Sequence, residues 1–408
     1  MANKNIPILC DDFTCTGCGA CENICPVDAI KLLPNKEGFG VPSIDSNKCI
    51  GCLKCEKCCP VINNKEINYG NEPKVYAAWN NDAKIREGSS SGGIFSALAE
   101  TIIKKGGVVC GAAYDASMNV NHIIIDSIDD IVKLRGSKYV QSNINKVYRE
   151  IKEYLKKDKL VLFVGTPCQV SGLKNYIVKD FDNLYCCDFI CHGVPSQLLF
   201  NKYIKWIENK NNIKISHFNF RHKIKGWYDA SRVYNNKTIL KGLDDAYFIW
   251  FNKNLSLRES CYKCPAIGLP RKGDITIADF WRIGMRNKFH SLKEINKGIS
   301  LIVTNNNKGS LLLKFISEKI SHEERSIDEA IYGNKPMIVP AYRPQNRENF
   351  YNDLQIYTFN DFINIYSNIN IKQKIINFLK ERFPKYFVLI FRNIIHLITF
   401  YKNGNKTL

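Results

Sequence analysis

The sequence predicts an α+β protein with a small cysteine-rich module at its N-terminus, a larger α/β domain and a helical C-terminal tail. Three observations predict this order: a repeated cysteine spacing in the first sixty residues, strand and helix patterns from about residue 75, and a basic apolar stretch at the end. We expect the module at 1–63, a linker at 64–74, the large domain at 75–345 and the tail at 346–408. A chain of 408 residues is long enough for two or three domains.

The number of cysteines, seventeen in all, points to metal or redox chemistry. Met1–Asn5 is polar and Ile6–Cys10 is too short for the apolar core of a secretion signal, so we expect a cytoplasmic location. In such a reducing compartment, cysteines are more often metal ligands or redox groups than disulfides.

Two copies of one spacing, C-x2-C-x2-C-x3-C-P, form the N-terminal module, and they begin at Cys15 and Cys49. Bacterial two-cluster ferredoxins have this spacing, and the fourth cysteine of each copy binds the cluster of the other copy. One [4Fe–4S] cluster is therefore assigned to Cys15, Cys18, Cys21 and Cys59, and the other to Cys49, Cys52, Cys55 and Cys25. The alternatives, zinc knuckles and disulfides, are disfavoured by the repeat of the whole pattern. Cys10 and Cys58 fall outside it and are interpreted as spare thiols.

Strand and helix patterns alternate after the linker. We expect strands at 75–79, 108–113, 160–164 and 184–190, and helices at 94–105 and 197–209. Ser91 is the expected N-cap of the first helix, and Gly106 and Gly107 are expected to end it.

The loop of Ser89, Ser90, Ser91, Gly92 and Gly93 allows two interpretations: a plain capping loop or a phosphate-binding loop at a helix start. No G-x-G-x-x-G follows a strand, so a standard dinucleotide-binding fold is not supported.

Four more cysteines are candidates for a third metal site. Thr166 and Pro167 predict a helix start that puts Cys168 in the first turn, where the helix dipole favours a thiolate. Cys191 follows the next strand, so both cysteines lie at carboxyl ends of strands, where α/β sheets bind ligands. Cys261 and Cys264 add a C-x2-C pair. We favour a third [4Fe–4S] cluster, with zinc or no metal as alternatives.

The formal net charge of +19 is unevenly spread along the chain, and +7 of it falls in the last 38 residues. Three thiolate-bound clusters would lower it to about +13. Residues 371–408 contain eight Lys or Arg and one Glu. Nucleic acid is not an expected partner, because no nucleic-acid motif accompanies the charge. The apolar stretch Tyr386–Tyr401 is either an interfacial helix in peripheral contact with the inner face of the membrane, or a helix packed on the protein or a partner.

Seven motifs in order carry a family resemblance: SSSGGIFSALA, RGSKYVQS, GTPCQVSGL, ICHGVPS, FRHK, CYKC and GDITIADFW. Together they resemble the family of coenzyme F(420) hydrogenase/dehydrogenase beta subunits, with a ferredoxin domain at the N-terminus. The resemblance covers about residues 9–345. It implies that the large domain binds FAD beside a cluster held by Cys168, Cys191, Cys261 and Cys264. The implied flavin contacts are Ser89–Gly93, Ser137, Lys138, Tyr139, Gly165 and Thr166.

The resemblance implies a flavin-dependent iron–sulfur oxidoreductase. A ferredoxin-type carrier or redox partner subunit would supply electrons, which the clusters and FAD would pass to a small-molecule substrate. The alternative is a non-catalytic relay subunit of a larger redox complex. Ala278 and Arg282 replace glycines that are usual in the family, so the substrate stays open. The family members that this chain resembles include proteins encoded with polysaccharide biosynthesis enzymes, and use of the deazaflavin coenzyme is not implied.

Overall fold

The computed structural model describes residues 5–64, 72–228, 230–235, 238–240, 245–289 and 292–367. The chain divides into two compact units, 1–359 and 360–408. In the second unit, the described part is most of α14 (Phe359–Tyr366). The basic segment 371–408, its expected membrane contact and most of the expected linker lie outside the described residues.

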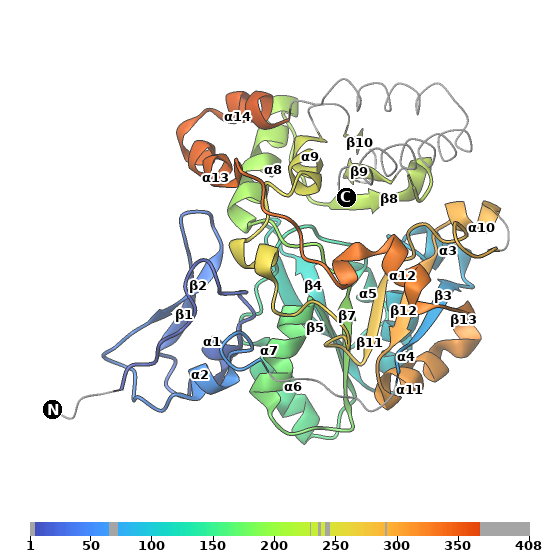
Figure 1. Cartoon of the computed structure of the whole chain (residues 1–408), viewed down its shortest axis with the longest axis horizontal. Coiled ribbons are helices and arrows are strands. Elements are labelled where there is room, and N and C mark those ends of the chain that lie inside the picture. Colours follow the sequence, from blue (N-terminus) through green and yellow to red (C-terminus); the bar gives the residue numbers. More distant parts are fainter. Residues whose placement is uncertain are drawn as a thin grey trace, which may run out of the picture. The chain divides into compact units, whose positions relative to one another are not determined.

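The N-terminal module pairs two short strands with two one-turn helices. Strands β1 (Ile30–Pro34) and β2 (Gly40–Ile44) are antiparallel, with Ile30 opposite Ile44. Helices α1 (Ala20–Ile24) and α2 (Lys54–Cys58) each follow a residue with positive φ, Gly19 at 78° and Leu53 at 56°. These left-handed residues turn the chain just before Cys21 and Cys55, so each of these cysteines lies in the first turn of its helix. Figure 1 draws this module in blue beside α6 and α7.

A mixed sheet of eight strands forms the centre of the large domain, in the order β13-β3-β12-β11-β7-β6-β4-β5. Strands β4, β6, β7 and β11 run parallel, and the remaining neighbours pair antiparallel. The strands are β3 (Lys74–Asn80), β4 (Val108–Tyr114), β5 (Val120–Ile125), β6 (Val161–Gly165), β7 (Leu184–Phe189), β11 (Ile275–Asp279), β12 (Ser300–Thr304) and β13 (Ile320–Arg325).

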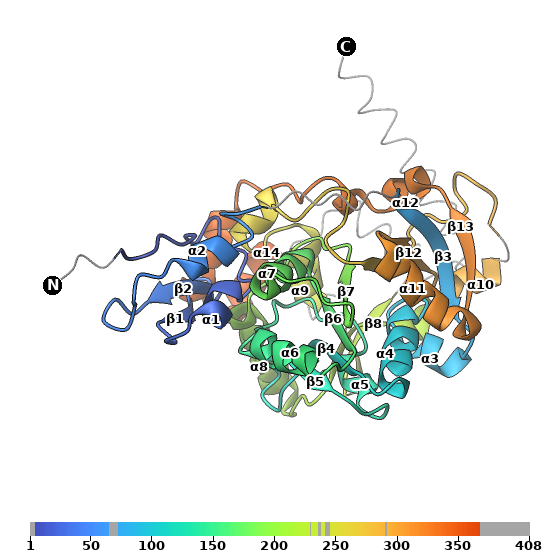
Figure 2. The same cartoon turned by 90° about the horizontal axis from the view of Figure 1, so that it is seen from below.

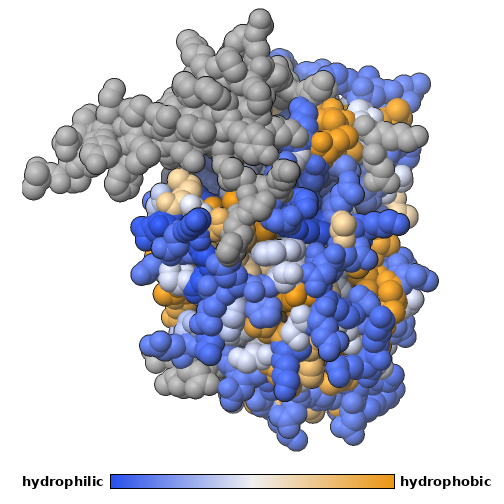
Figure 3. Space-filling view, turned by 90° about the vertical axis from the view of Figure 1, so that its right-hand side faces the viewer, coloured by the Kyte–Doolittle hydropathy of each residue, from blue (hydrophilic) through white to orange (hydrophobic). Residues whose placement is uncertain are grey.

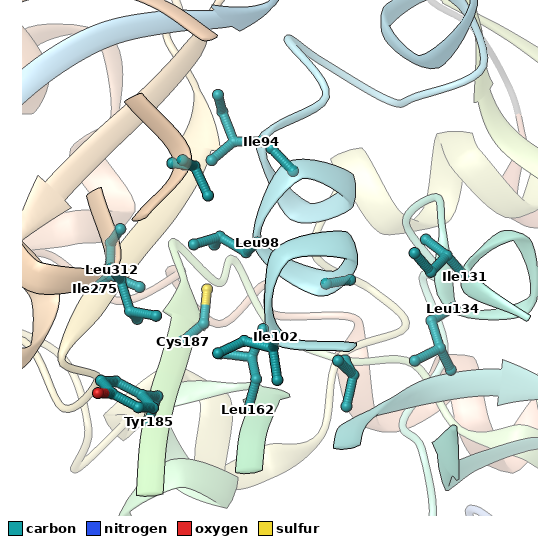
Figure 4. Packing of buried hydrophobic residues seen from close by; sticks show 14 of the residues in the cluster. Ile94, Leu98, Ile102, Ile131, Leu134, Leu162, Tyr185, Cys187, Ile275 and Leu312 are labelled. Atoms are coloured by element: carbon teal, nitrogen blue, oxygen red, sulfur yellow. The ribbon is translucent and has the colours of Figure 1, made fainter. Parts of the chain in front are cut away.

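Helices cover both faces of this sheet, because its central strands are apolar on both sides. Leu162 and Cys187 face the layer of α4 (Ile94–Lys104) and α11 (Asn307–Ile316), as Figure 4 shows for α4. Their neighbours Phe163 and Cys186 face the layer of α6 (Val147–Lys156) and α7 (Pro167–Ile177). Figure 2 shows α6 and α4 on opposite sides of β4 and β6. The carboxyl ends of the parallel strands therefore lie along one edge of the sheet, and α7 begins at this edge, directly after β6.

A smaller antiparallel sheet, β8 (Phe218–His222), β9 (Ser231–Tyr234) and β10 (Thr238–Ile239), packs through aromatic rings on α8 (Gln197–Asn211) and α9 (Ala246–Asn252). The other described helices are α3 (Ala83–Glu87), α5 (Ile131–Leu134), α10 (Leu292–Asn296), α12 (Ile327–Gly333) and α13 (Arg347–Ile356). Short 3-10 helices are η1 (Lys223–Lys225), η3 (Glu259–Lys263), η4 (Ser317–Lys319) and η5 (Lys335–Met337).

The expected strands and helices of the large domain are confirmed to within two residues at each end. The expected N-cap at Ser91 is wrong, because α4 begins after Gly93. Gly93 has a φ of 86° and turns the chain into the helix, while the Ser91 hydroxyl donates to Ile299 O at 2.9 Å. At the other end, Gly106 has a φ of 77° and Gly107 N donates to Ile102 O, which ends the helix as expected.

Polar side chains predominate on the face shown in Figure 3, where apolar side chains form only small groups. Within the described ranges, none of the helices combines the length and the apolar character that a bilayer crossing requires.

Candidate functional site

Five cysteines of the N-terminal module line one pocket. Four of them follow the predicted ligand spacing, and we name these the proximal set: Cys15, Cys18, Cys21 and Cys59. Apolar side chains close the same pocket, among them Leu9, Leu32 and Pro42. Cys21 lies in α1, whereas Cys59 directly follows α2. The pocket thus brings the fourth cysteine of the second copy to the first three cysteines of the first copy.

The second N-terminal group is the distal set, Cys25, Cys49, Cys52 and Cys55. Cys25, Cys49 and Cys55 are buried in one apolar cluster with Ala29 and Ile30. Cys52 is exposed to solvent. Burial, with a smaller contribution from the charge of Cys52, raises the pKa of Cys55 to about 11. The structure therefore gathers three of these thiols inside the module and leaves the fourth at its surface.

Main-chain N–H groups point at sulfur atoms in both sets. Gly17 N donates to Cys15 Sγ at 3.3 Å, and Ala29 N donates to Cys25 Sγ at 3.2 Å. Such bonds stabilise thiolates and tune cluster potentials. In the part of the chain that is described, no three His, Cys, Asp or Glu side chains converge as ligands of a single metal ion. In a cubane cluster each thiolate binds a different iron, so a pocket lined by separated thiols suits the cluster chemistry.

Cys168, Cys191, Cys261 and Cys264 form the third set. Cys168 lies in the first turn of α7, Cys191 follows β7, and the other two lie in and after η3. Burial raises the pKa of Cys191, and the charges of the other three thiols raise it further, so all four are neighbours. Burial, with a smaller contribution from the charge of Cys264, raises the pKa of Cys168 to about 11. These thiols are ionised at neutral pH only when a cation binds them, which suits a metal site.

Helix α7 joins the third set to the proximal set. A Cβ atom added at Gly172 would lie 3.0 Å from Cys18 Sγ, so this glycine lets the helix approach the ligand directly. The Tyr148 hydroxyl lies 2.8 Å from both Cys18 O and Gln169 O. The charge of Cys168 contributes to the raised pKa of Cys18, whose first cause is burial. Residues of α7 therefore touch both sets.

Arg258 also connects the two sets. Its side chain is 1% exposed, and its Nε donates to Cys15 O at 2.6 Å. Nη1 donates to Gln141 Oε1 at 2.8 Å and Nη2 to Gly40 O at 2.9 Å. The positive charge of Arg258 acts on the thiols of Cys15, Cys168 and Cys261, in each case favouring the thiolate. A buried cation thus lies close to thiols of both sets, where it favours their ionised form.

Two of the three segments implied as flavin contacts touch each other. Ser137 N donates to Ser90 Oγ at 3.0 Å, which links the loop Ser89–Gly93 to the segment Ser137–Tyr139. Thr166 instead joins the third set, with its hydroxyl 3.1 Å from Cys168 Sγ. Lys138 Nζ donates to three carbonyls at the end of α5, those of Lys133, Leu134 and Arg135. Its position is therefore set by a helix end, and burial lowers its pKa to about 7.

A second lysine, Lys223, binds the main chain of the serine loop Ser89–Gly93. Lys223 Nζ donates to Ser91 O at 2.7 Å and to Lys297 O at 2.8 Å, and it also contacts Arg86 O. Burial lowers the pKa of Lys223 to about 7. Gly92 N donates to Ser300 Oγ at 2.9 Å. These contacts fix the loop against β12 before any ligand binds.

An aromatic and ionic cluster lies next to Tyr139. Arg221 Nη2 lies 3.3 Å from Asp279 Oδ1, and its guanidinium stacks over the Trp281 ring at 4.8 Å. Trp281 stacks in turn on Trp227, with ring centroids 4.9 Å apart. Burial raises the pKa of Tyr139, and the positive charge of Arg221 partly offsets this increase. Arg221 is 7% exposed, and its Nε is among the described buried atoms without a hydrogen-bond partner.

Sequence reasoning did not single out Arg258, Gln141 or Lys223. Arg258 lies three residues before Cys261, so its nearness to the C-x2-C pair was a signal that could have found it. Gln141 and Lys223 lie in the motifs RGSKYVQS and FRHK, but these motifs do not indicate the contacts of the two side chains, because those contacts join distant parts of the fold. His192 is a hydrogen-bonding histidine: its Nε2 lies 2.6 Å from Asn254 Oδ1, and burial lowers its pKa.

Comparison with known proteins identifies the two parts of the chain. The family described as "Coenzyme F420 hydrogenase/dehydrogenase, beta subunit" matches at residues 75–149 with its N-terminal model and at 158–330 with its C-terminal model. A 4Fe-4S dicluster domain matches at residues 14–63.

One curated protein and one solved structure are similar to this chain. A subunit of the F(420)H(2) dehydrogenase of Methanosarcina mazei is 30% identical over 173 residues, an alignment that covers 39% of this chain and 47% of that protein. The chain thus spans about half the length of this curated relative. A chain of the F420-reducing [NiFe] hydrogenase complex from Methanosarcina barkeri is 14% identical, with a TM-score of 0.45, over 70% of this chain and 93% of that chain.

The residues fit the cofactors of this family. The N-terminal domain binds two [4Fe–4S] clusters, and the large domain binds a third cluster and FAD. The donor set of cysteine thiols is chemically suited to iron, and N–H groups directed at sulfur and the buried Arg258 cation would stabilise the thiolates. The chain belongs to the family of coenzyme F420 hydrogenase/dehydrogenase beta subunits.

Proposed function

We propose that this chain transfers electrons between a redox partner docked at its distal cysteine set and a small organic substrate bound beside the flavin of the large domain. Iron–sulfur clusters move single electrons, and a flavin supplies the two-electron chemistry that most organic reductions require. The observation that carries the proposal is the direct packing of α7 against Cys18, because that helix also bears Cys168.

The cysteine sets would form an electron path that runs from the distal set through the proximal set to the third set. The distal set has the exposed Cys52, and the proximal set contacts α7 where Cys18 packs against Gly172. We assign the third set to the cluster nearest the flavin, because Thr166 joins Cys168 to the end of β6. Arg258 and Tyr148 hold the module against the large domain, so they fix the separation between the proximal and third sets.

The surface around Cys52 suits an acidic protein carrier of the ferredoxin type. Ile50 is 57% exposed and Ile8 is 82% exposed, and Ile8 N is anchored to α2 by a hydrogen bond to Glu56 Oε1 at 2.6 Å. Lys54 and Lys57 on α2 are exposed. The lysines would attract an acidic partner, and the exposed apolar side chains would provide a small contact that excludes water.

The serine loop and its neighbour are our candidates for the flavin contacts. These candidates are Ser89–Gly93, Ser137, Lys138, Tyr139, Gly165 and Thr166. Ser89–Gly93 directly precede α4, Gly165 ends β6 and Thr166 caps α7, while Ser137 contacts Ser90. We assign the substrate to the Arg221 side of this region. The unpaired Nε of Arg221 and the stacked Trp227 and Trp281 suit a flat ring system that carries a negative group.

A deazaflavin coenzyme is the first substrate to test, because the relative from Methanosarcina mazei is named for F(420)H(2). Such a molecule combines a flat ring with anionic groups, which matches the Arg221 region. The assignment remains separate from the electron path, since the path depends only on the cysteine sets and α7.

Anaerobic isolation with quantitative iron, sulfide and flavin analysis is the first test. A reduced ferredoxin-type donor is then mixed with the holoprotein and coenzyme F420, and the acceptor absorbance is followed. Turnover in the absence of other proteins supports the enzyme proposal. Donor oxidation without turnover of any acceptor would instead identify a relay subunit, and iron-loaded protein with no affinity for flavin would contradict the flavin site.

A further inference from the structure

Cys10 is a fifth thiol in the pocket of the proximal set. Its Sγ lies 3.7 Å from Cys59 Sγ, and Cys10 lines the same pocket as Cys15, Cys18 and Cys21. Cys10 lies outside both copies of the cysteine spacing, and its position next to Cys59 arises only in the folded module. It is half-buried.

The main chain holds Cys10 in this place from both sides. Before it, Ile8 N donates to Glu56 Oε1 at 2.6 Å, which ties the segment to the helix that precedes Cys59. After it, Asp11 Oδ1 accepts from Thr14 N at 2.9 Å, and Cys15 N donates to Asp11 O at 2.9 Å. The segment between two anchors is short, so the Cys10 thiol stays within reach of the site that Cys59 serves.

The other spare thiol of the module has a different environment. Cys58 Sγ lies 3.4 Å from Cys55 O, and the side chain is buried among the core residues under α7. Cys58 is therefore a natural control: it neighbours Cys59 in sequence and is a buried thiol with a partner of its own.

We propose that Cys10 is a stand-by ligand of the proximal cluster that replaces Cys59 at its iron. In the exchange, the bond from iron to Cys59 sulfur breaks and a bond from iron to Cys10 sulfur forms. The proton of the Cys10 thiol passes to Cys59, so the number of electrons on the cluster does not change. A stand-by ligand would keep the proximal cluster in place when Cys59 dissociates. This role of Cys10 does not depend on the identity of the electron acceptor.

Ligand variants of the full-length holoprotein test the proposal. We expect Cys59→Ala to retain the wild-type iron and acid-labile sulfide, while Cys10→Ala/Cys59→Ala loses about one third of both, which is one cluster of three. Cys15→Ala serves as the control, because it removes a ligand without a reserve. Loss of iron in Cys59→Ala equal to that in Cys15→Ala would overturn the proposal, and so would full iron in the double variant. Electron paramagnetic resonance of the reduced proteins identifies which cluster is lost.

A second experiment leaves every assigned ligand in place. Iron release to a chelator is followed in wild type, Cys10→Ala and Cys58→Ala. If Cys10 recaptures the iron whenever Cys59 dissociates, Cys10→Ala releases iron from one cluster several-fold faster than wild type, whereas Cys58→Ala matches wild type. Equal rates in wild type and Cys10→Ala would overturn the proposal, even if Cys59→Ala did not fold.

Discussion

The guanidinium of Arg258 donates to the main-chain oxygen of Cys15 at 2.6 Å, and it is a fully buried cation between the N-terminal module and the third cysteine set. Each of its three nitrogen atoms donates to an oxygen of a different segment, namely the main-chain oxygens of Cys15 and Gly40 and the side-chain oxygen of Gln141. One side chain therefore holds the module in place and places a positive charge beside two groups of thiolates.

We expect Arg258→Met to shift the midpoint potentials of the proximal and third clusters to more negative values, because a nearby cation stabilises the reduced, more negative cluster. Redox titration followed by electron paramagnetic resonance measures the shift. The lost hydrogen bonds would also cost about 2–4 kcal/mol of the free energy of unfolding. Arg258→Lys keeps the charge but not the three-way contact, so it should lower the melting temperature while leaving the potentials closer to wild type. Unchanged potentials in Arg258→Met would refute the electrostatic role.

Removal of one thiol of the third set should remove one cluster and leave the N-terminal pair. Cys191→Ala is expected to lose about one third of the iron and sulfide, because four thiolates are needed to hold a [4Fe–4S] cluster. Cys110→Ala is the matched control, since Cys110 is a fully buried thiol in β4 that packs in the core. The ligand assignment would be wrong if both variants kept the same iron, or if Cys191→Ala lost the signals of the N-terminal clusters instead.

Arg221 is expected to bind an anionic group of the substrate. Arg221→Gln removes the charge and should raise the substrate KM about tenfold to a hundredfold, the effect of one charged hydrogen bond of roughly 1.5–3 kcal/mol. Steady-state kinetics with coenzyme F420 measures it. Arg232→Gln is a suitable comparison, because Arg232 pairs with Asp245 and is partly buried as well. An equal rise in KM for both variants would point to a general structural effect.

His122 should make the stability depend on pH. Its Nε2 lies 3.1 Å from Val164 O, which only accepts, and its Nδ1 lies 2.8 Å from Ser142 Oγ, so the ring is held neutral. Burial lowers its pKa to about 4, from about 6.5 in an unfolded chain. Between these values the unfolded state binds more protons, so stability is complete above about pH 6.5 and is lost as the pH falls toward 4, by about 3 kcal/mol in total.

Melting temperatures of wild type and His122→Gln between about pH 4.5 and 7.5 check this dependence. The variant is expected to be less stable at neutral pH but to have a flatter pH profile. His322→Gln, at an exposed position, serves as the control. Parallel profiles for wild type and His122→Gln would show that another group dominates the acid sensitivity.

Local signals in the sequence predicted four strands of the large sheet and two of its helices, and cysteine spacing predicted the ligand sets of the N-terminal module. The continuous apolar run of Val161, Leu162 and Phe163 predicts a buried strand, and Thr166 with Pro167 predicts the start of α7. These signals succeed because they depend on neighbours in sequence: strand periodicity, helix capping and cysteine spacing. The expected N-cap at Ser91 was wrong because a positive φ at Gly93 competes with a serine cap, and both fit the same loop.

The sequence by itself determined that thiolates occur in three groups and that a helix begins just before Cys168. Only the tertiary structure decided which N-terminal group meets that helix, that Gly172 admits Cys18 to it, and that Arg258 and Cys10 belong to the surroundings of the proximal set. The physical reason is that these contacts join residues far apart in the chain, and their energies arise from burial and charge that no spacing rule encodes.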